Sequence, residues 1–405
     1  MTTEHIEEPQ AARPGRRPEL DAIRTLVVVG LVFFHSALVF DTRDDFYVKN
    51  AETTEATTVV AGLGVVWAMP MLFLIAGLGS WHSLRRRGPA GFAAERLRRL
   101  GVPLVFATLT IIPVPQWLRL RADPGYHESY LRFLPQFFDV HLEPAEFPFV
   151  VQGRYFETGH LWFVVLLLAF SLLLAPLAGR LPRDRGRRIR DRLVTAARWR
   201  GAALLPAAPV AAVSALLGLE EAYAGWSRWA YLLFFLYGFV LASDERLRAA
   251  VRRDAVPAAV LGLALFLIGM VGFLAVSDIP GGDPFTDMTA LAIGVRTLYG
   301  AAGWCWLVAI TGLLDRRRPA PAAAQDPPRS RGRRLYGYLA LAALPLYILH
   351  QPIVVGVAYG VVGRQAPMAV KYAVIVAASL ALTVAAYDLL VRRTRVTRSL
   401  FGMRG

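Results

Sequence analysis

Ten long hydrophobic blocks dominate this chain of 405 residues. Each block is about 17–25 residues long, the length that a helix needs to cross a hydrocarbon core about 30 Å thick. Backbone N–H and C=O groups in lipid must bond within the span, so such blocks fold as helices. We therefore predict an all-α, polytopic membrane protein with about ten transmembrane helices. The predicted spans are 23–40, 58–80, 100–118, 160–179, 201–217, 228–243, 256–276, 289–313, 336–357 and 368–391.

The basic residues lie mainly between the hydrophobic blocks. If the N-terminus is placed inside, the predicted cytoplasmic segments hold 35 of the 45 Lys and Arg residues. Short cytoplasmic loops of membrane proteins carry such an excess. The pattern predicts that both termini are cytoplasmic and that the chain is a multi-pass protein of the cell membrane. It also argues against a nucleic-acid partner, because the net charge of +15 is divided among separate loops.

Three regions are predicted along the chain. Residues 1–20 are polar and contain three prolines, which predicts a disordered cytoplasmic N-terminus. Residues 21–391 form the membrane domain, and residues 392–405 form a basic cytoplasmic tail. The single cysteine, Cys305, excludes a disulfide within the chain and a thiolate metal cluster.

The first span carries three ionisable residues, Asp21, Arg24 and His35. Charged groups inside a span are costly, so each is a functional candidate. Arg24 and His35 differ by about 20° around a helix and by about 16 Å along it, and Asp21 lies about 40° to the other side. One helix face therefore presents an acid–base pair near the cytoplasm and an imidazole deeper in the bilayer. Alternatively, Arg24 is an orientation charge, Asp21 is a helix-capping charge, and His35 is a packed histidine.

Two further histidines are predicted in the outer half of the bilayer. His160 begins the fourth span, and His350 lies about 21 Å from the cytoplasmic end of the ninth. The sequence does not show whether they converge on His35, and their spacing does not favour a metal site. His160 can also be an interfacial residue beside Trp162. Arg296, in the eighth span, either snorkels outward or faces an aqueous cavity beside the histidines.

Arginines cluster where the second span ends and the third begins. Arg96 and Arg99 immediately precede the third span, and residues 85–87 close the second. Orientation charge alone explains such clusters. The functional alternative is an anion site, because guanidinium groups bind phosphate through paired hydrogen bonds. A phosphorylated donor such as coenzyme A would need such a site on this side.

Four segments together resemble a known family. LDAIRTLVVVGLVFFH, an arginine followed by ten residues and a histidine, resembles the signature of the acyltransferase-3 membrane family. Arg96-Leu-Arg-Arg99 is similar to its Arg-x-x-Arg motif, and HLWFVVLLL and LYILHQP resemble two further family segments. The resemblance covers residues 18–391 in the right order. The run MPMLFLIAGLGSWHSLRRRG looks closest to the branch that includes glucan-modifying succinyltransferases.

The resemblance implies O-acyl transfer from a cytoplasmic donor, usually acyl-CoA, to a hydroxyl of a carbohydrate, glycolipid or other cell-envelope acceptor. Acyl-CoA is then a co-substrate, and no other cofactor is expected. The resemblance makes His35 the essential histidine, Arg24 its partner, and Arg96 and Arg99 the cytoplasmic motif. Some members carry a C-terminal hydrolase-like domain, which we expect to be absent because the chain ends 14 residues after its last predicted span.

We expect His35 to act as a general base, with Arg24 and Asp21 also catalytic. Arg96, Arg99, His160, Arg296 and His350 are expected to bind substrate. Arg296 or His350 could stabilise the oxyanion, and an acyl-histidine intermediate stays open. The alternative function is a transporter or flippase of a glycan or lipid-linked substrate. Its hallmark would be inverted repeats with matching interrupted helices, which the sequence does not clearly contain.

Overall fold

The computed structural model describes residues 18–316 and 331–403. Most of the predicted disordered segment, 1–20, lies outside the described residues, and the first helix begins at Pro18. The helices are α1 Pro18–Leu38, α2 Ala56–Val65, α3 Ala68–Arg96, α4 Val102–Thr110, α5 Pro113–Arg121, α6 Tyr130–Phe137, α7 Trp162–Arg180, α8 Arg183–Ala196, α9 Ala207–Leu217, α10 Arg228–Leu241, α11 Glu245–Ser277, α12 Ala290–Arg316, α13 Arg331–Val361, α14 Met368–Ala386 and α15 Arg395–Leu400.

The described residues contain little else besides helix, which confirms the predicted all-α class. Strands β1 Val140–Leu142 and β2 Val151–Gly153 form one short antiparallel pair, with Val140 opposite Gly153. A π-helical turn, Leu97–Gly101, joins α3 to α4, and another, Tyr387–Val391, extends α14. Short 3₁₀ turns precede α7, α9 and α10.

Seven helical segments of the described chain are long and apolar enough to cross a membrane. The predicted spans 58–80 and 100–118 merge into one of them, a helical run over Gly62–Arg121. This run bends at Gly88, whose φ of 70° suits glycine and precedes Pro89. The predicted spans 201–217 and 228–243 contain helices of only 11 and 14 residues. The count of about ten crossings and the orientation of the termini therefore stay predictions.

Helices α3 and α10 cross at two glycines. A Cβ atom on Gly77 would lie 2.0 Å from the carbonyl oxygen of Phe235, and one on Gly238 would lie 2.0 Å from that of Leu74. Helices in membranes pack through small residues because lipid provides no hydrophobic drive for their association. The sequence therefore allows a close backbone contact here that any larger residue would prevent.

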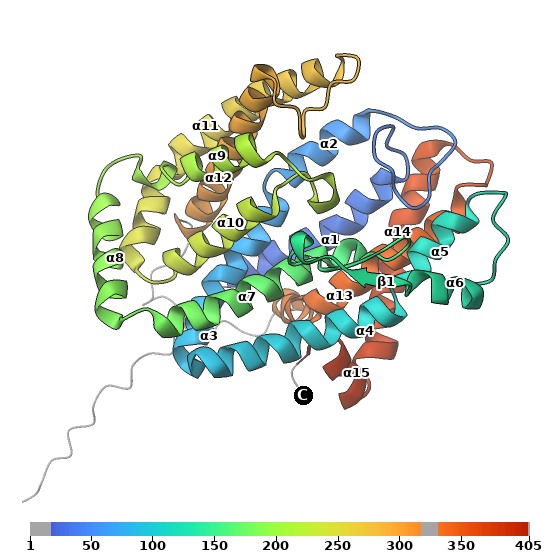
Figure 1. Ribbon diagram of the computed structural model, residues 1–405, viewed down its shortest axis with the longest axis horizontal. Coiled ribbons are helices and arrows are strands. Elements are labelled where there is room, and N and C mark those ends of the chain that lie inside the picture. The colour runs from blue at the N-terminus through green and yellow to red at the C-terminus, as the bar shows by residue number, and fades with distance from the viewer. Residues whose placement is uncertain (1–17, 317–330, 404–405) are drawn as a thin grey trace, which may run out of the picture.

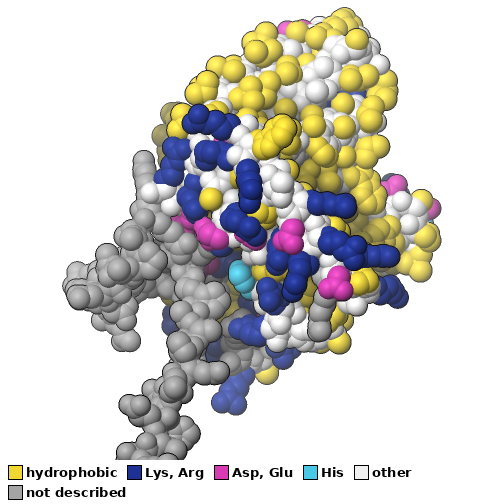
Figure 2. All heavy atoms as spheres, turned by 90° about the vertical axis from the view of Figure 1, so that its left-hand side faces the viewer, with side chains coloured by type: hydrophobic (Ala, Val, Ile, Leu, Met, Phe, Trp, Pro, Cys, Tyr) yellow, Lys and Arg dark blue, Asp and Glu magenta, His cyan; other side chains and the backbone are white. Residues whose placement is uncertain are grey.

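The packing of five helices positions the candidate site. Helix α1 packs against α13 and α14, and α7 packs against α3. Helix α8 lies at the left-hand edge of Figure 1 and runs across the direction of α7, which precedes it in the chain. Figure 2 views this edge and shows Lys and Arg side chains gathered on it. The molecule therefore has one strongly basic end.

Candidate active site

Three histidines from distant segments meet between α1, the turn before α7, and α13. The Nδ1 atom of His35 lies 3.0 Å from Nε2 of His350. The rings of His35 and His350 are 5.0 Å apart between centroids, and those of His160 and His350 are 5.1 Å apart. The convergence that the sequence left open is thus present in the structure.

The hydrogen bonds of His350 assign the proton positions in the neutral pair. Nδ1 of His350 donates to the carbonyl oxygen of Tyr347, at 2.6 Å, because a carbonyl can only accept. Nε2 of a neutral His350 is then an acceptor, so Nδ1 of His35 donates to it. This leaves Nε2 of His35 without a proton. The atom with the free lone pair is therefore Nε2 of His35.

His160 is buried within the protein, with 5% of its surface exposed. Its Nε2 donates to the carbonyl oxygen of Ile348 at 3.0 Å, and the hydroxyl of Tyr347 donates to the carbonyl of His160. These two bonds tie the turn before α7 to α13. His160 therefore holds the cluster together and is not exposed beside Trp162.

A loop that follows α1 covers the other side of the cluster. The ring of Phe46 stacks on His35 with 5.9 Å between centroids. The neighbouring Tyr47 donates a hydrogen bond to the carboxylate of Glu157, three residues before His160. Burial raises the pKa of Glu157, which outweighs the opposite effect of the bond from Tyr47. This pair closes the loop over the histidines.

A cavity of about 1510 Å³ lies among α1, α3, α7 and α13, and we call it the arginine cavity. Its volume is above the range typical of small-molecule sites. Arg24 and Asp21 line it, so the predicted cytoplasmic part of the α1 face borders this space. Its described lining contains seven arginines against two acidic residues. The arginines are Arg24, Arg85, Arg86, Arg87, Arg96, Arg99 and Arg398.

Glu95 organises the arginines of this cavity. Its carboxylate lies 3.1 Å from Arg87 and 3.7 Å from Arg99, and it accepts a hydrogen bond of 2.7 Å from Ser83. Arg96 donates to Ser80 at 3.0 Å and lies over the ring of Phe92. Glu95 was not among the predicted site residues, although a lone acid within an arginine-rich run was the available signal.

The two predicted groups at the mouth of the cavity contact each other. Asp21 accepts a hydrogen bond of 2.8 Å from Arg24, one helical turn away. The chain after the last span also reaches this cavity, where the carbonyl of Gly402 accepts a bond of 3.4 Å from Arg99. Arg398 and Met403 complete this part of the lining.

The arginine cavity ends at Tyr347 and Phe163, whose rings are 5.5 Å apart. None of the three clustered histidines is among the described residues that line it. Tyr347 is nevertheless bonded to both His160 and His350, as described above. Tyr347 therefore contacts both the arginine cavity and the histidine cluster, and it was not among the predicted site residues.

Arg296 lies away from the histidine cluster. Its side chain extends toward the loop before α12 but is fully buried there, so it is not exposed as a snorkelling arginine would be. It donates to the carbonyl oxygens of Pro284 and Ala215, both at 3.2 Å, and contacts the sulfur of Met288. None of these partners belongs to the histidine cluster. Arg296 ties the loop before α12 to α9, because its hydrogen bonds replace the water it lost on burial.

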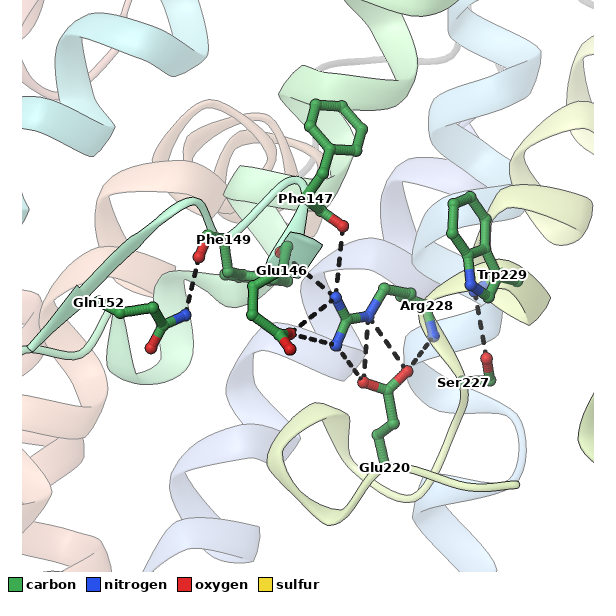
Figure 3. Close-up of polar contacts among 8 residues, drawn as sticks. All are labelled: Glu146, Phe147, Phe149, Gln152, Glu220, Ser227, Arg228 and Trp229. Carbon is green, nitrogen blue, oxygen red and sulfur yellow. Dashed lines mark hydrogen bonds and ion pairs between the residues drawn. The ribbon is translucent and has the colours of Figure 1, made fainter. Parts of the chain in front are cut away.

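Another arginine that the sequence analysis did not name fixes two loops at the start of α10 (Figure 3). Arg228 bonds Glu220 at 2.7 Å and Glu146 at 3.4 Å, and its guanidinium lies over the ring of Tyr223. Tyr223 in turn contacts Trp162, with 5.7 Å between ring centroids. The network thus supports the first turn of α7, beside His160.

Among the described residues, the imidazoles of the candidate site are not arranged to hold a metal ion. Across residues 18–316 and 331–403, no group of three or more His, Cys, Asp or Glu side chains could hold a metal ion. The imidazoles of the site can transfer protons, and its guanidinium groups can bind anions.

Long apolar helices that enclose a polar cavity and a buried histidine cluster define a multi-pass membrane protein with an enzyme-like site. The chain belongs to the acyltransferase-3 family, whose model, described as an acyltransferase domain, matches residues 17–388. This match confirms the resemblance and indicates a membrane acyltransferase. No curated protein and no solved structure gives a significant match. The glucan-modifying branch stays a prediction.

Proposed function

We propose that this protein is an O-acyltransferase of the cell membrane that uses acyl-CoA and acylates a hydroxyl of a carbohydrate or glycolipid. The observation that carries the proposal is the contact between His35 and His350, just beyond an arginine-lined cavity. Family membership supports acyl transfer, and the choice of donor and acceptor follows from the chemistry of the two sites. The basic end is taken as the cytoplasmic side.

The donor binds in the arginine cavity. Coenzyme A carries several phosphate groups, and guanidinium groups bind phosphate through paired, charge-assisted bonds. Arg96 and Arg99 both line the cavity and have different partners, Ser80 and Glu95, so they can contact different phosphates. The acyl thioester points inward, toward Tyr347 and Phe163. Movement of the Tyr347 side chain would admit it to the histidine cluster.

His35 is the general base of the proposed reaction. Its Nε2 takes the proton of the acceptor hydroxyl while that oxygen attacks the thioester carbonyl carbon. The carbon–sulfur bond then breaks, and the coenzyme A thiolate takes the proton back from the imidazolium. His350 is a positioning residue, because it holds Nδ1 of His35 as a donor and leaves Nε2 as the base. Arg24 and Asp21 act at the mouth of the arginine cavity, where the acyl-CoA donor binds. Arg296 has no part in this step, since its hydrogen bonds lie elsewhere.

The test is acceptor-dependent release of coenzyme A by the protein in nanodiscs, with a panel of glycan and glycolipid acceptors. His35→Ala should lower the rate by about 10²–10⁴-fold, the usual contribution of a positioned base. His141→Ala is the matched control, because His141 is exposed in β1. It should keep the wild-type rate. A His35→Ala variant that turns over normally would remove His35 from the chemistry.

The same preparation separates an enzyme from a transporter. A transporter would move an unmodified glycan across a vesicle membrane without consuming the acyl donor. Family membership does not favour that alternative. Release of coenzyme A that depends on an acceptor would support the enzyme, whereas uptake without release would overturn it.

A further inference from the structure

A second cavity lies at the basic end of the molecule, between α8 and the turn that leads to α9. Its volume is about 800 Å³. Arg188 and Arg192, one helical turn apart on α8, line it together with Arg200. In the described part of the chain these three guanidinium groups form no hydrogen bond or ion pair. The one acidic residue of the described lining, Asp191, is paired with Arg190 at 3.4 Å. The cavity therefore offers three unpaired positive charges.

The opposite wall of this cavity is apolar and exposed. Trp199 has 78% of its surface exposed and Leu205 has 67%. The neighbouring face of α8 adds Ile189, with 50% exposed, and Leu193, with 40%. Such exposure is costly in water, whereas tryptophan and leucine beside arginine are typical of the membrane interface.

The turn between α8 and α9 is held in place by buried polar contacts. Arg253 donates to the carbonyls of Ala197 and Arg198, both at 3.1 Å. Asp254 bonds Arg253 at 2.8 Å and accepts from the backbone of Ala203 at 3.2 Å. These bonds anchor to α11 the backbone of the turn that carries Trp199 and Arg200.

The position of α8 places this cavity at the level of the lipid headgroups. Helix α7, one of the segments long enough to span the membrane, ends just before α8 begins. Helix α8 then runs across the direction of α7 (Figure 1). A basic, amphipathic helix in that place lies along the membrane surface.

We propose that this cavity binds one anionic phospholipid of the surrounding bilayer. The three arginines hold the phosphate, and Trp199 and Leu205 contact the glycerol and the upper acyl chains. The bound lipid fixes α8 to the membrane surface at the basic end. A soluble phosphate would use the arginines but would leave the apolar wall exposed, so the lipid accounts for both halves of the cavity.

The test compares two triple variants with equal loss of charge. Arg188→Gln, Arg192→Gln and Arg200→Gln remove the cavity arginines. Arg185→Gln, Arg187→Gln and Arg198→Gln remove exposed arginines of the same segment that do not line the cavity. Native mass spectrometry of each purified full-length protein measures retention of phosphatidylglycerol relative to phosphatidylcholine.

We expect wild type to retain phosphatidylglycerol in preference to phosphatidylcholine. In the cavity variant the ratio of the two retained lipids should be at least about tenfold lower. The control variant should stay within about twofold of wild type, and Trp199→Ala should also weaken retention. If both triple variants lost this preference equally, the arginines would attract anionic lipid through their overall charge and not through a defined site, which would overturn the proposal. So would the absence of any preference in wild type, or its removal by excess inorganic phosphate.

Discussion

The arginine cavity and the histidine cluster are adjacent, yet their polar groups are satisfied in opposite ways. In the cavity, seven arginines surround two acids and leave an excess of positive charge beside open space. In the cluster, neighbouring backbone carbonyls and a second imidazole take up the hydrogen bonds of His160 and His350. Tyr347 belongs to both regions.

This difference indicates a division of labour. Excess charge beside open space suits a ligand that brings its own negative charge, because binding then replaces lost hydration. A compact network of neutral donors and acceptors suits proton transfer, because it fixes which nitrogen carries the proton. In our proposal, donor affinity is set in the cavity and the rate of chemistry is set in the cluster. Mutations in the two regions should therefore change different kinetic constants.

The largest effect that tests this division is expected at His350. His350→Phe removes the acceptor for Nδ1 of His35, so the tautomer of His35 is no longer fixed. We expect kcat to fall by about 10²-fold while the KM for acyl-CoA stays unchanged. His350→Gln should restore part of the rate, because its amide oxygen can accept the same bond. Equal rates for the two variants would show that His350 only fills space.

A smaller effect is expected at the arginines of the cavity. In the double variant Arg96→Gln and Arg99→Gln, each charged hydrogen bond, worth about 1.5–3 kcal/mol, is replaced by a neutral one worth about 0.5–1.5 kcal/mol. We expect the KM for acyl-CoA to rise by about 10–100-fold with kcat nearly unchanged. Arg98→Gln is the matched control, since Arg98 is exposed and does not line the cavity. A lower kcat in the double variant, at saturating donor, would contradict the division.

The smallest effect concerns the packing of α3, one of the helices around the arginine cavity, against α10. Gly77→Val would force α3 and α10 apart and should lower the free energy of unfolding by about 1–3 kcal/mol. Gly79→Val is the control, because a Cβ atom there would meet nothing within 4 Å. Thermal unfolding in detergent should show a lower melting temperature for the Gly77 variant alone. Equal melting temperatures would show that the close crossing is not needed.

The fold was predictable to the level of its class and family. Hydrophobic block length predicted membrane-spanning helices because the thickness of the bilayer is fixed. The predicted span 201–217 contains two prolines, and the helix within it has only 11 residues. The predicted spans 58–80 and 100–118 lie in one run over Gly62–Arg121, which is interrupted by a kink at Gly88, where the backbone angles are not helical.

The candidate site was predictable only where it lies on one helix. The spacing of Asp21, Arg24 and His35 places them on one face by helix geometry alone, and the first two line the arginine cavity. For Arg296, the sequence indicates only how deep the residue lies along its helix and not which segments surround its side chain. Its neighbours, Pro284 and Ala215, come from other segments and determine that it is buried away from the histidines.

The sequence by itself determined which segments are helical, which end of the molecule is basic and which family the chain belongs to, because these depend on local composition and spacing. Only the tertiary structure brought His35 and His350, 315 residues apart, to hydrogen-bonding distance. It also placed Tyr347 in contact with both the cavity and the cluster. Such contacts depend on how each helix is rotated about its axis and how deeply it sits against its neighbours. Packing between distant segments sets both.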